Sequence, residues 1–462
     1  MAEIKTGLVF RSYQILRTIR KFSVYTRREI EEMLDLFVKE ESHTLRSFLD
    51  ERHDGAGLKF LQEILGGHVI EAVEARDKGK KVVMIPFNFP PEVINAFDNA
   101  VPFTTEVVTT TGTLALAHQG EPYWDYAVSL GIPDFVCSAN TIALGSILLS
   151  TQAKEFVPDL MISAAPGSCD ANSKIHEFVS EFLGIPEIIL DKTGDSVRDF
   201  ELYKRLFYRM FLRLEEKLGE VDEDKLIKTI EKCNEATELF WELYELKKNI
   251  PCPVPNMFTL MSYGTRFTMW GRDEAIEMFR KLVDVAEKRL KKGEYPAEKE
   301  IARSLWVYTG YYIDLFEFWL WLEDNGISYL NDVLNAQVLK EMHEVNTKEE
   351  AIDAFANNAW NYVMTRQMGA ENMGLKWVED ATHLFRDLNA NCAIYSGHHA
   401  CKQSQSVFRI LRDEFTKEGI PVLRLDGDCW NRRITPVSVL QETILDFINN
   451  VVAKSKKRRR RG

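Results

Sequence analysis

A repeated segment constrains the fold of this chain more than any other feature. Each copy holds an apolar run typical of a β-strand, then a cysteine, a helical stretch, the tripeptide Gly-Ile-Pro and a second apolar run followed by an aspartate. One copy extends from Asp159 to Asp191 and contains Cys169, and the other extends from Cys392 to Asp426 and contains Cys401. Strands that alternate with helices predict parallel pairing in a doubly wound sheet. The repeat therefore predicts two α/β units with a cysteine at the same place in both.

The remainder of the chain fits two such units that are preceded and separated by helices. With 462 residues the chain is too long for one ordinary core. Apolar residues recur at helical spacing in residues 1–80, and residues 197–250 are helical and highly charged. We expect an α/β fold with two doubly wound parallel-sheet domains of the Rossmann or flavodoxin type, an N-terminal helical region and a helical insertion. The expected boundaries are 1–80 for the N-terminal region, 81–300 for the first domain with its insertion, 301–453 for the second domain and 454–462 for a basic disordered tail.

The charge of the chain argues against nucleic acid as a partner. The net charge is −12, although residues 454–462 carry seven Lys and Arg side chains. The remaining body is acidic, which does not suit a broad nucleic-acid surface. The basic tail fits a disordered run, a contact with an acidic partner or a targeting signal. No apolar stretch reaches the roughly 18 residues that span a bilayer, and no secretory signal pattern is visible. We therefore expect a cytoplasmic protein without a membrane contact.

The chain holds seven cysteines at wide spacing. An odd number of cysteines in a long chain does not indicate a disulfide framework. Three of them are expected to be buried free thiols, which behave as small hydrophobic groups. These three are Cys233 within a helix, Cys252 between two prolines and Cys392 on a strand.

Three other cysteines, Cys137, Cys169 and Cys401, each precede a predicted helix. Cys169 and Cys401 follow predicted strands, at the edge of an open parallel sheet where ligands bind. Cys137 follows a short extended piece predicted at Asp134–Val136. The start of a helix stabilises a thiolate, and thiolate is the species that ligates iron. The three residues could hold a [4Fe-4S] cluster with one iron left open. Three unrelated helix-start cysteines would give the same pattern, and a zinc site fits less well because no tight Cys/His pair is present.

Four sequence blocks share an order and a separation that are typical of one enzyme family. The blocks are Gly131–Ser138, Val157–Asp159 with Gly167–Asp170, Gly271–Ala275, and Tyr395–Lys402 with the following Gly-Ile-Pro and Asp426–Asp428. Each motif is loose, but together they cover roughly residues 80–455. With these blocks the chain resembles the 2-hydroxyacyl-CoA dehydratase and benzoyl-CoA reductase family.

The resemblance implies that Cys137, Cys169 and Cys401 bind one [4Fe-4S] cluster between two α/β domains. It also implies a related second subunit or a homodimer partner, an ATP-hydrolysing iron–sulfur activator that injects one electron, and an acyl-CoA substrate. Dehydratases of this family remove water from a 2-hydroxyacyl-CoA through a ketyl radical, whereas the reductases add electrons to the aromatic ring of benzoyl-CoA. Two other classes stay open. One is a double-cubane protein without a CoA substrate, whose cluster is shared across a dimer, and the other is a binding module with buried thiols.

Histidines and tyrosines near these motifs are further candidates for the site. His398 and His399 precede Cys401 and could donate a proton or bind a thioester oxygen, or only hydrogen-bond within their loop. Tyr311 and Tyr312 follow a predicted strand and suit either an acyl pocket or the core.

Four other polar residues bear on the site in different ways. Glu106 lies on a strand predicted at Phe103–Val108 and could reach the cleft. Asp170 suits a cap of the helix after Cys169, and Lys402 suits either the surface or a contact to a CoA phosphate. Asn431 stands where many members of the family carry an acid, which leaves the acyl group of the substrate open.

Overall fold

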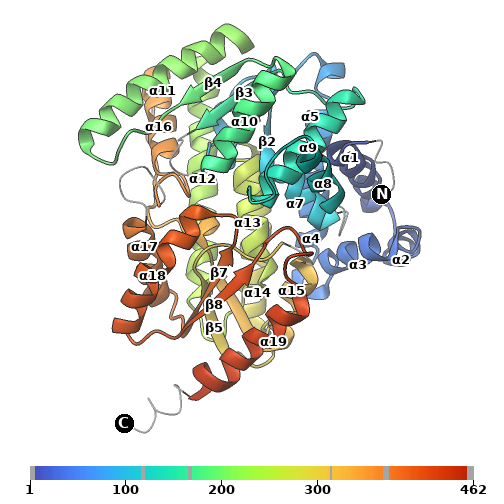
Figure 1. The fold of residues 1–462 in the computed structure, drawn as a ribbon, viewed down its shortest axis with the longest axis vertical. Helices are drawn as coiled ribbons and strands as arrows, with labels where there is room; N and C mark the ends of the chain where they lie inside the picture. The colour runs from blue at the N-terminus through green and yellow to red at the C-terminus, as the bar shows by residue number, and fades with distance from the viewer. Residues whose placement is uncertain (1–5, 116–119, 165–168, 313–314, 368–373, 455–462) are drawn as a thin grey trace.

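Two parallel sheets form the framework of the computed structural model, which describes residues 6–115, 120–164, 169–312, 315–367 and 374–454. Within these residues each sheet has four strands, in the orders β2-β1-β3-β4 and β6-β5-β7-β8. All neighbouring strands are parallel. The strands are β1 (Lys81–Ile85), β2 (Ala100–Thr104), β3 (Leu160–Ala164), β4 (Glu187–Leu190), β5 (Ala302–Trp306), β6 (Ile327–Asn331), β7 (Cys392–His398) and β8 (Val422–Gly427). The predicted α/β fold with two doubly wound parallel sheets is therefore confirmed (Figure 1).

The two sheets have the same topology, and the repeat occupies equivalent places in them. In the first sheet the chain passes from β1 to β2 on one side and returns to β3 on the other side of β1. In the second sheet β5, β6 and β7 are arranged in the same way. Such a reversal of strand order opens a crevice beyond the carboxyl ends of the central strands. Cys169 follows β3 and Cys401 follows β7, so the sequence repeat placed both cysteines correctly at this edge.

Burial explains why most strands were recognisable in the sequence. Every residue of β2, β3, β5, β6 and β7 is buried, whereas the outer strands β4 and β8 contain exposed positions. Parallel strands covered on both faces are near-continuous apolar runs. The helices that flank the sheets are α6 (Glu92–Asn95), α7 (Thr105–Ala115), α8 (Glu121–Ser129), α9 (Ser138–Gln152), α10 (Asp170–Leu183), α15 (Leu315–Asp324), α16 (Lys348–Trp360), α17 (Leu375–Asp387), α18 (Lys402–Lys417) and α19 (Val437–Phe447).

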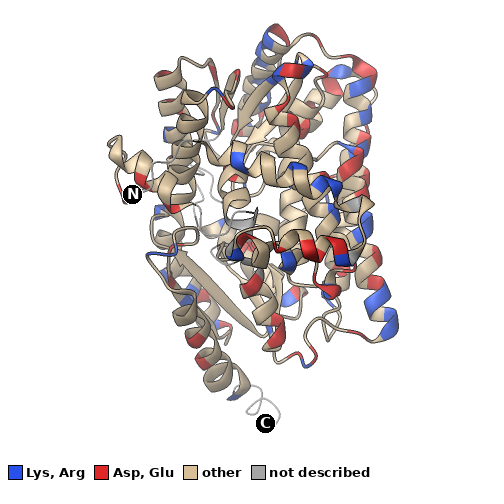
Figure 2. Ribbon diagram, turned by 90° about the vertical axis from the view of Figure 1, so that its right-hand side faces the viewer, with Lys and Arg blue, Asp and Glu red and all other residues tan. Residues whose placement is uncertain are grey.

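Further helices lie beside the first sheet and between the two sheets. The N-terminal region contains α1 (Leu8–Ile19), α2 (Arg27–Leu34), α3 (Lys39–Phe48), α4 (Ala56–Lys59) and α5 (Gly66–Val73), and the charged insertion forms α11 (Val197–Leu218) and α12 (Glu223–Lys247). They are followed by α13 (Met257–Thr268) and α14 (Asp273–Lys292). Helix α13 contacts both β2 and β6 and lies near the middle of the molecule in Figure 1. Figure 2 shows many of the Lys, Arg, Asp and Glu residues on the outer helices.

Three local expectations are wrong. The strand predicted at Phe103–Val108 ends at Thr104, and Glu106 lies in the first turn of α7. The β-branched run Thr104–Thr111 resembles a strand in sequence, but tertiary packing overrides that preference. Asp134–Val136 is a turn in which the Val136 N–H donates to the Pro133 carbonyl at 3.1 Å. Strand β6 was not predicted; its run, ISYLN, is interrupted by Ser328 and ends in Asn331.

Some expectations fall on residues that the structure does not describe. Residues 455–462 of the basic tail and residues 167–168 of the second sequence block lie outside the described ranges. Among the described helices, none combines the length and the apolar character needed to cross a membrane.

Candidate functional site

A cavity lies where the carboxyl ends of the two sheets face each other. It encloses about 1050 Å³, including space that opens to solvent. Its wall draws on the segments that follow β1, β2, β3, β5 and β6, and also on α13. Most of the wall is apolar or aromatic, with few polar groups, which is the usual composition of a small-molecule site. Apolar and aromatic side chains in the wall include Phe60, Phe87, Leu260, Phe267, Tyr308 and Leu334.

Cys137, Cys169 and Cys401 all line this one cavity, although they are far apart in the sequence. Each is the residue that precedes the first turn of a helix: Cys137 for α9, Cys169 for α10 and Cys401 for α18. The Cys401 thiol also accepts the Ser404 N–H at 3.4 Å, whereas the side chains of Cys137 and Cys169 form no capping hydrogen bond. Three helix N-termini are thus directed at one place, which favours negative charge there.

The thiols of Cys137 and Cys169 nevertheless do not ionise easily in a cavity without a cation. Burial, and then the neighbouring Cys401 and Asp428, raise the pKa of Cys137 to about 12. Burial, and then Cys137 and Cys401, hold the pKa of Cys169 well above its ordinary value. A bound metal centre reverses this balance, because its positive charge stabilises thiolates. Among the described residues, no group of three or more His, Cys, Asp or Glu converges on a single ion. The donor set therefore fits a cluster with one cysteine on each of three metal atoms better than it fits one zinc ion.

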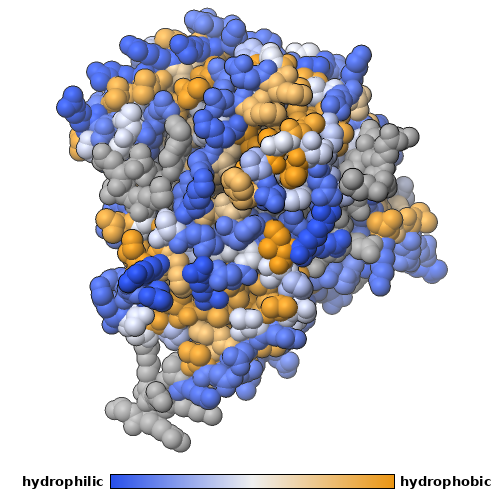
Figure 3. All heavy atoms as spheres, in the orientation of Figure 1, coloured by the Kyte–Doolittle hydropathy of each residue, from blue (hydrophilic) through white to orange (hydrophobic). Residues whose placement is uncertain are grey.

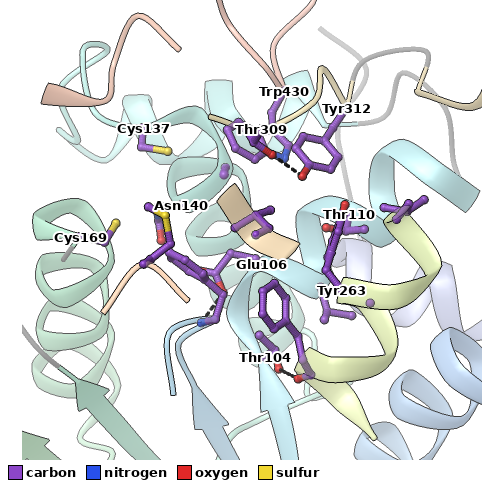
Figure 4. Close-up of a pocket in the computed structure, with 18 of the residues that line it drawn as sticks. Thr104, Glu106, Thr110, Cys137, Asn140, Cys169, Tyr263, Thr309, Tyr312 and Trp430 are labelled. Carbon is purple, nitrogen blue, oxygen red and sulfur yellow. Dashed lines mark hydrogen bonds between the residues drawn. The ribbon is translucent and has the colours of Figure 1, made fainter. Parts of the chain in front are cut away.

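Glu106 is the acidic side chain of the cavity wall whose chemistry best suits a catalytic acid. Its Oε2 accepts the backbone N–H of Phe87 at 2.9 Å, and the side chain of Asn172 donates to its Oε1. Burial raises its pKa to about 8, and these hydrogen bonds only partly oppose that rise. The carboxyl group is therefore mostly protonated at neutral pH and can donate a proton into the cavity. Figure 4 shows Glu106 between the two labelled cysteines and the tyrosines.

Aromatic side chains form the opposite wall of the cavity. Tyr312 stacks on Trp430 with ring centroids 5.0 Å apart, and Tyr263 meets Tyr312 edge-on at 6.1 Å. The Tyr312 and Thr309 hydroxyl groups are 2.5 Å apart (Figure 4). Tyr312 thus lines the pocket, whereas Tyr311 lies in the core and donates to the Leu425 carbonyl at 3.3 Å. Sequence reasoning did not single out Trp430, although its position just after β8 was a signal that could have found it.

The two candidate histidines do not line the cavity. His398 is buried at the end of β7, where its Nδ1 accepts the Cys429 N–H at 3.3 Å and burial lowers its pKa. His399 is partly exposed, and its contact with Asp428 raises its pKa. Both side chains contact Asp428 and not the cavity. A catalytic role for these histidines stays a prediction.

Asp428 connects the cysteine-bearing loops of the two halves. Its Oδ1 accepts the Ser138 hydroxyl at 2.5 Å and the Asn431 N–H at 2.7 Å. Burial alone would raise the pKa of Asp428, but His398, His399 and Ser138 lower it to about 2. Ser138 directly follows Cys137, so this carboxylate ties the start of α9 to the loop after β8.

Asp170 makes a second connection of the same kind. It accepts from Gln403 at 3.1 Å and lies 3.4 Å from the Lys402 Nζ. Asp170 is the first residue of α10 and not its N-cap, a position held by Cys169 without a side-chain capping bond, but the Asp170 Oδ1 accepts the Ala171 N–H of the first turn at 2.9 Å. Asp170, the residue after Cys169, thus contacts Lys402 and Gln403, the two residues after Cys401.

Comparison with known proteins decides which family these features belong to. The family model described as 2-hydroxyglutaryl-CoA dehydratase, D-component, matches residues 86–450. The chain belongs to this family. The match includes the three cysteines, Glu106 and the aromatic wall, and it confirms the predicted family and an enzyme subunit.

One curated relative of this dehydratase family is the (R)-phenyllactyl-CoA dehydratase alpha subunit of Clostridium sporogenes. It is 22% identical to this chain over 392 residues, which are 80% of this chain and 89% of the relative. The similarity therefore covers most of both chains.

A groove on the outer surface shares lining residues with the cysteine cavity. It is lined by Phe135, Lys174, Phe178 and Lys402, and also by Cys137, which lines the inner cavity as well. Phe135 is 66% exposed. Figure 3 shows apolar surface over α10 on this face. Cys137 thus lies in the wall shared by the cavity and the outer groove.

Asp428 should contribute stability that depends on pH. Its pKa is lowered to about 2 from 3.8, so its ionised form stabilises the fold above about pH 4. Asp428→Asn should lower the free energy of unfolding by about 2 kcal/mol near neutral pH. The difference from the wild-type protein should shrink as the pH falls from about 4 toward 2. Urea unfolding of both proteins at several pH values measures this difference in the free energy of unfolding.

The matched control is Asp446→Asn on the exposed face of α19, which should change stability little at any pH. A destabilisation by Asp428→Asn that is the same at acidic and neutral pH would show that the carboxylate charge is not what joins the loops.

Proposed function

We propose that this chain is the subunit of a 2-hydroxyacyl-CoA dehydratase in which Cys137, Cys169 and Cys401 bind a [4Fe-4S] cluster. The supporting observation is that three cysteines, each at a helix N-terminus, line one cavity in a member of the dehydratase family. When bound, the cluster would supply the electron that converts the thioester carbonyl to a ketyl radical, and an open iron for the leaving hydroxyl group. Three cysteine ligands leave one of four irons open.

The residues of the cavity would bind and orient the substrate for this reaction. The apolar wall of Phe60, Leu260 and Phe267 would bury an apolar acyl chain and exclude water. The stacked pair Tyr312 and Trp430 suits an aromatic or other flat acyl group. The relative from Clostridium sporogenes is named for an aryl substrate, phenyllactyl-CoA. An apolar or aromatic 2-hydroxyacyl group is therefore the proposed substrate.

Glu106 would act as the general acid. A hydroxyl group leaves more readily when it is protonated, and a carboxyl group with a pKa near 8 holds its proton at neutral pH. Glu106 also lies close enough to Cys169 to raise the pKa of that thiol. It therefore faces the place where the cluster would be held.

Partner proteins follow from the same proposal. The relative is an alpha subunit, which supports a related second subunit, or a second copy of this chain, as the partner. We also propose an ATP-hydrolysing iron–sulfur activator in the cytoplasm, whose electron would arrive through the outer groove at Cys137. The matching family is named for a dehydratase, and nothing in the described residues favours a benzoyl-CoA reductase or a double-cubane protein over it.

The activity can be tested with the chain, its partner subunit, the activator, ATP and a 2-hydroxyacyl-CoA such as phenyllactyl-CoA under anaerobic conditions. Formation of the corresponding enoyl-CoA is expected. Cys401→Ala should lower the rate at least about 100-fold, because a cluster ligand is lost. Cys233→Ala removes a buried thiol outside the cavity and should leave the activity nearly unchanged. Full activity of Cys401→Ala would contradict the proposal.

Glu106→Gln should separate proton transfer from binding. The amide keeps the shape but cannot donate a proton in the same way, so kcat should fall about 100-fold with little change in KM. The wild-type rate should fall as the pH rises through about 8, because Glu106 loses its proton there. The variant should lack this decline. Single-turnover rates between pH 6 and pH 9.5 measure both effects, with Glu177→Gln on the exposed face of α10 as the control.

The role of Glu106 would be refuted if the variant kept the alkaline decline of the wild-type enzyme. A normal kcat in the variant would refute it equally.

A further inference from the structure

A second cavity lies between the two halves of the chain and shares no lining residue with the cysteine cavity. It encloses about 500 Å³, including space that opens to solvent. Glu92 reaches it from α6, Arg266 from α13 and Asn358 from α16. Two residues that directly follow members of its lining in the sequence, Phe267 and Met364, line the cysteine cavity. The proposed dehydration does not use this second cavity.

Arg266 is the unusual group in this cavity. Its side chain is only 6% exposed, and its Nη1 is buried without a hydrogen-bond partner. Across the described residues its guanidinium has no carboxylate within the 4.0 Å of an ion pair, and it only lies over the Tyr362 ring at 4.8 Å. Arginine cannot lose its proton in a protein. A fixed positive charge is therefore buried in the cavity wall with no carboxylate in direct contact, although it acts from farther away on Glu92 and Glu341.

Other buried polar atoms around the same cavity also lack partners. They are the Nε of Arg366, the Oε2 of Glu92 and the Oε1 of Gln337. Buried polar groups in folded proteins are almost always hydrogen-bonded. Their convergence on one cavity indicates a site that a polar ligand completes.

The two carboxyl groups of the cavity do not neutralise Arg266 fully. Burial raises the pKa of Glu92 to about 7 and that of Glu341 to about 7. Asn358 donates to Glu92 at 3.4 Å and Asn361 donates to Glu341 at 2.5 Å, so amide groups, not arginines, contact these carboxyls. At neutral pH both are partly protonated and can themselves donate to an oxygen atom of a ligand.

We propose that this cavity binds a small oxyanion, a carboxylate or inorganic phosphate, held by Arg266 and by the Nε of Arg366. The planar guanidinium group matches oxyanions with two parallel hydrogen bonds. Water could satisfy the neutral groups but would leave the charge of Arg266 unpaired in a buried site. The depth of Arg266 and the size of the cavity favour a small anion.

Thermal unfolding of the full chain, in a buffer free of oxyanions, tests the site. Phosphate and malonate are added in separate series, with sodium chloride at equal ionic strength as the reference. One of the two should raise the Tm by about 2–3 °C at one hundred times its dissociation constant. Arg266→Met should abolish this rise. Arg28→Met removes an arginine that is 88% exposed on α2, and this variant should show the same rise in Tm as the wild-type protein.

Two further results decide the proposal. Arg266→Met should unfold no earlier than the wild-type protein without oxyanion, because it removes an unpaired buried charge. A large fall in Tm there would show that Arg266 already has a partner. Glu341→Gln removes a competing carboxylate and should tighten anion binding several-fold above about pH 7. Loss of binding in Glu341→Gln, or an equal rise in Tm for the wild type and Arg266→Met, would overturn the site.

Discussion

Three helices begin at one cavity, and the residue that begins each of them is a cysteine. Cys137, Cys169 and Cys401 stand where a capping oxygen usually does, and the Cys401 thiol accepts the Ser404 N–H from the first turn. Burial keeps such thiols neutral, while three helix dipoles favour their ionised form. A cationic metal centre would resolve that conflict. The two parallel sheets serve this arrangement, because only their facing carboxyl ends bring α10 and α18 to the same place.

The two halves are joined close to the cysteines by polar contacts. Asp428 holds the residue after Cys137, and Asp170 holds the residues after Cys401. Farther out, Arg433 forms a two-point contact with Asp125 at 2.7 and 2.9 Å. Asp428 is buried, whereas the Arg433–Asp125 contact is largely exposed, and exposed ion pairs of this kind add little stability. Any shift of one half relative to the other would therefore change the distances between the three thiols.

The sequence was sufficient for the two parallel sheets, apart from strand β6 and the end of β2, and for the placement of two cysteines. Buried parallel strands are apolar runs, and the repeat put Cys169 and Cys401 at equivalent strand ends. Cys137 lies outside the repeat, and it was grouped with them by the family blocks and by an extended piece that is in fact a turn. Glu106 was placed on a strand because the β-branched residues around it obscure the start of α7. Trp430 and the buried Arg266 were not found, because both depend on contacts between segments that are distant in sequence and carry no periodic signal.

The central claim is that one iron–sulfur cluster with an open iron is held by three cysteines. Iron and acid-labile sulfide analysis of the anaerobically purified chain, together with Mössbauer spectroscopy, tests it most directly. About four irons and four sulfides per chain are expected, with one iron distinct from the other three. Cys137→Ala, Cys169→Ala and Cys401→Ala should each lose most of the iron, and Cys252→Ala should retain it. A chain that takes up no iron, or that keeps it in all three variants, would contradict the account.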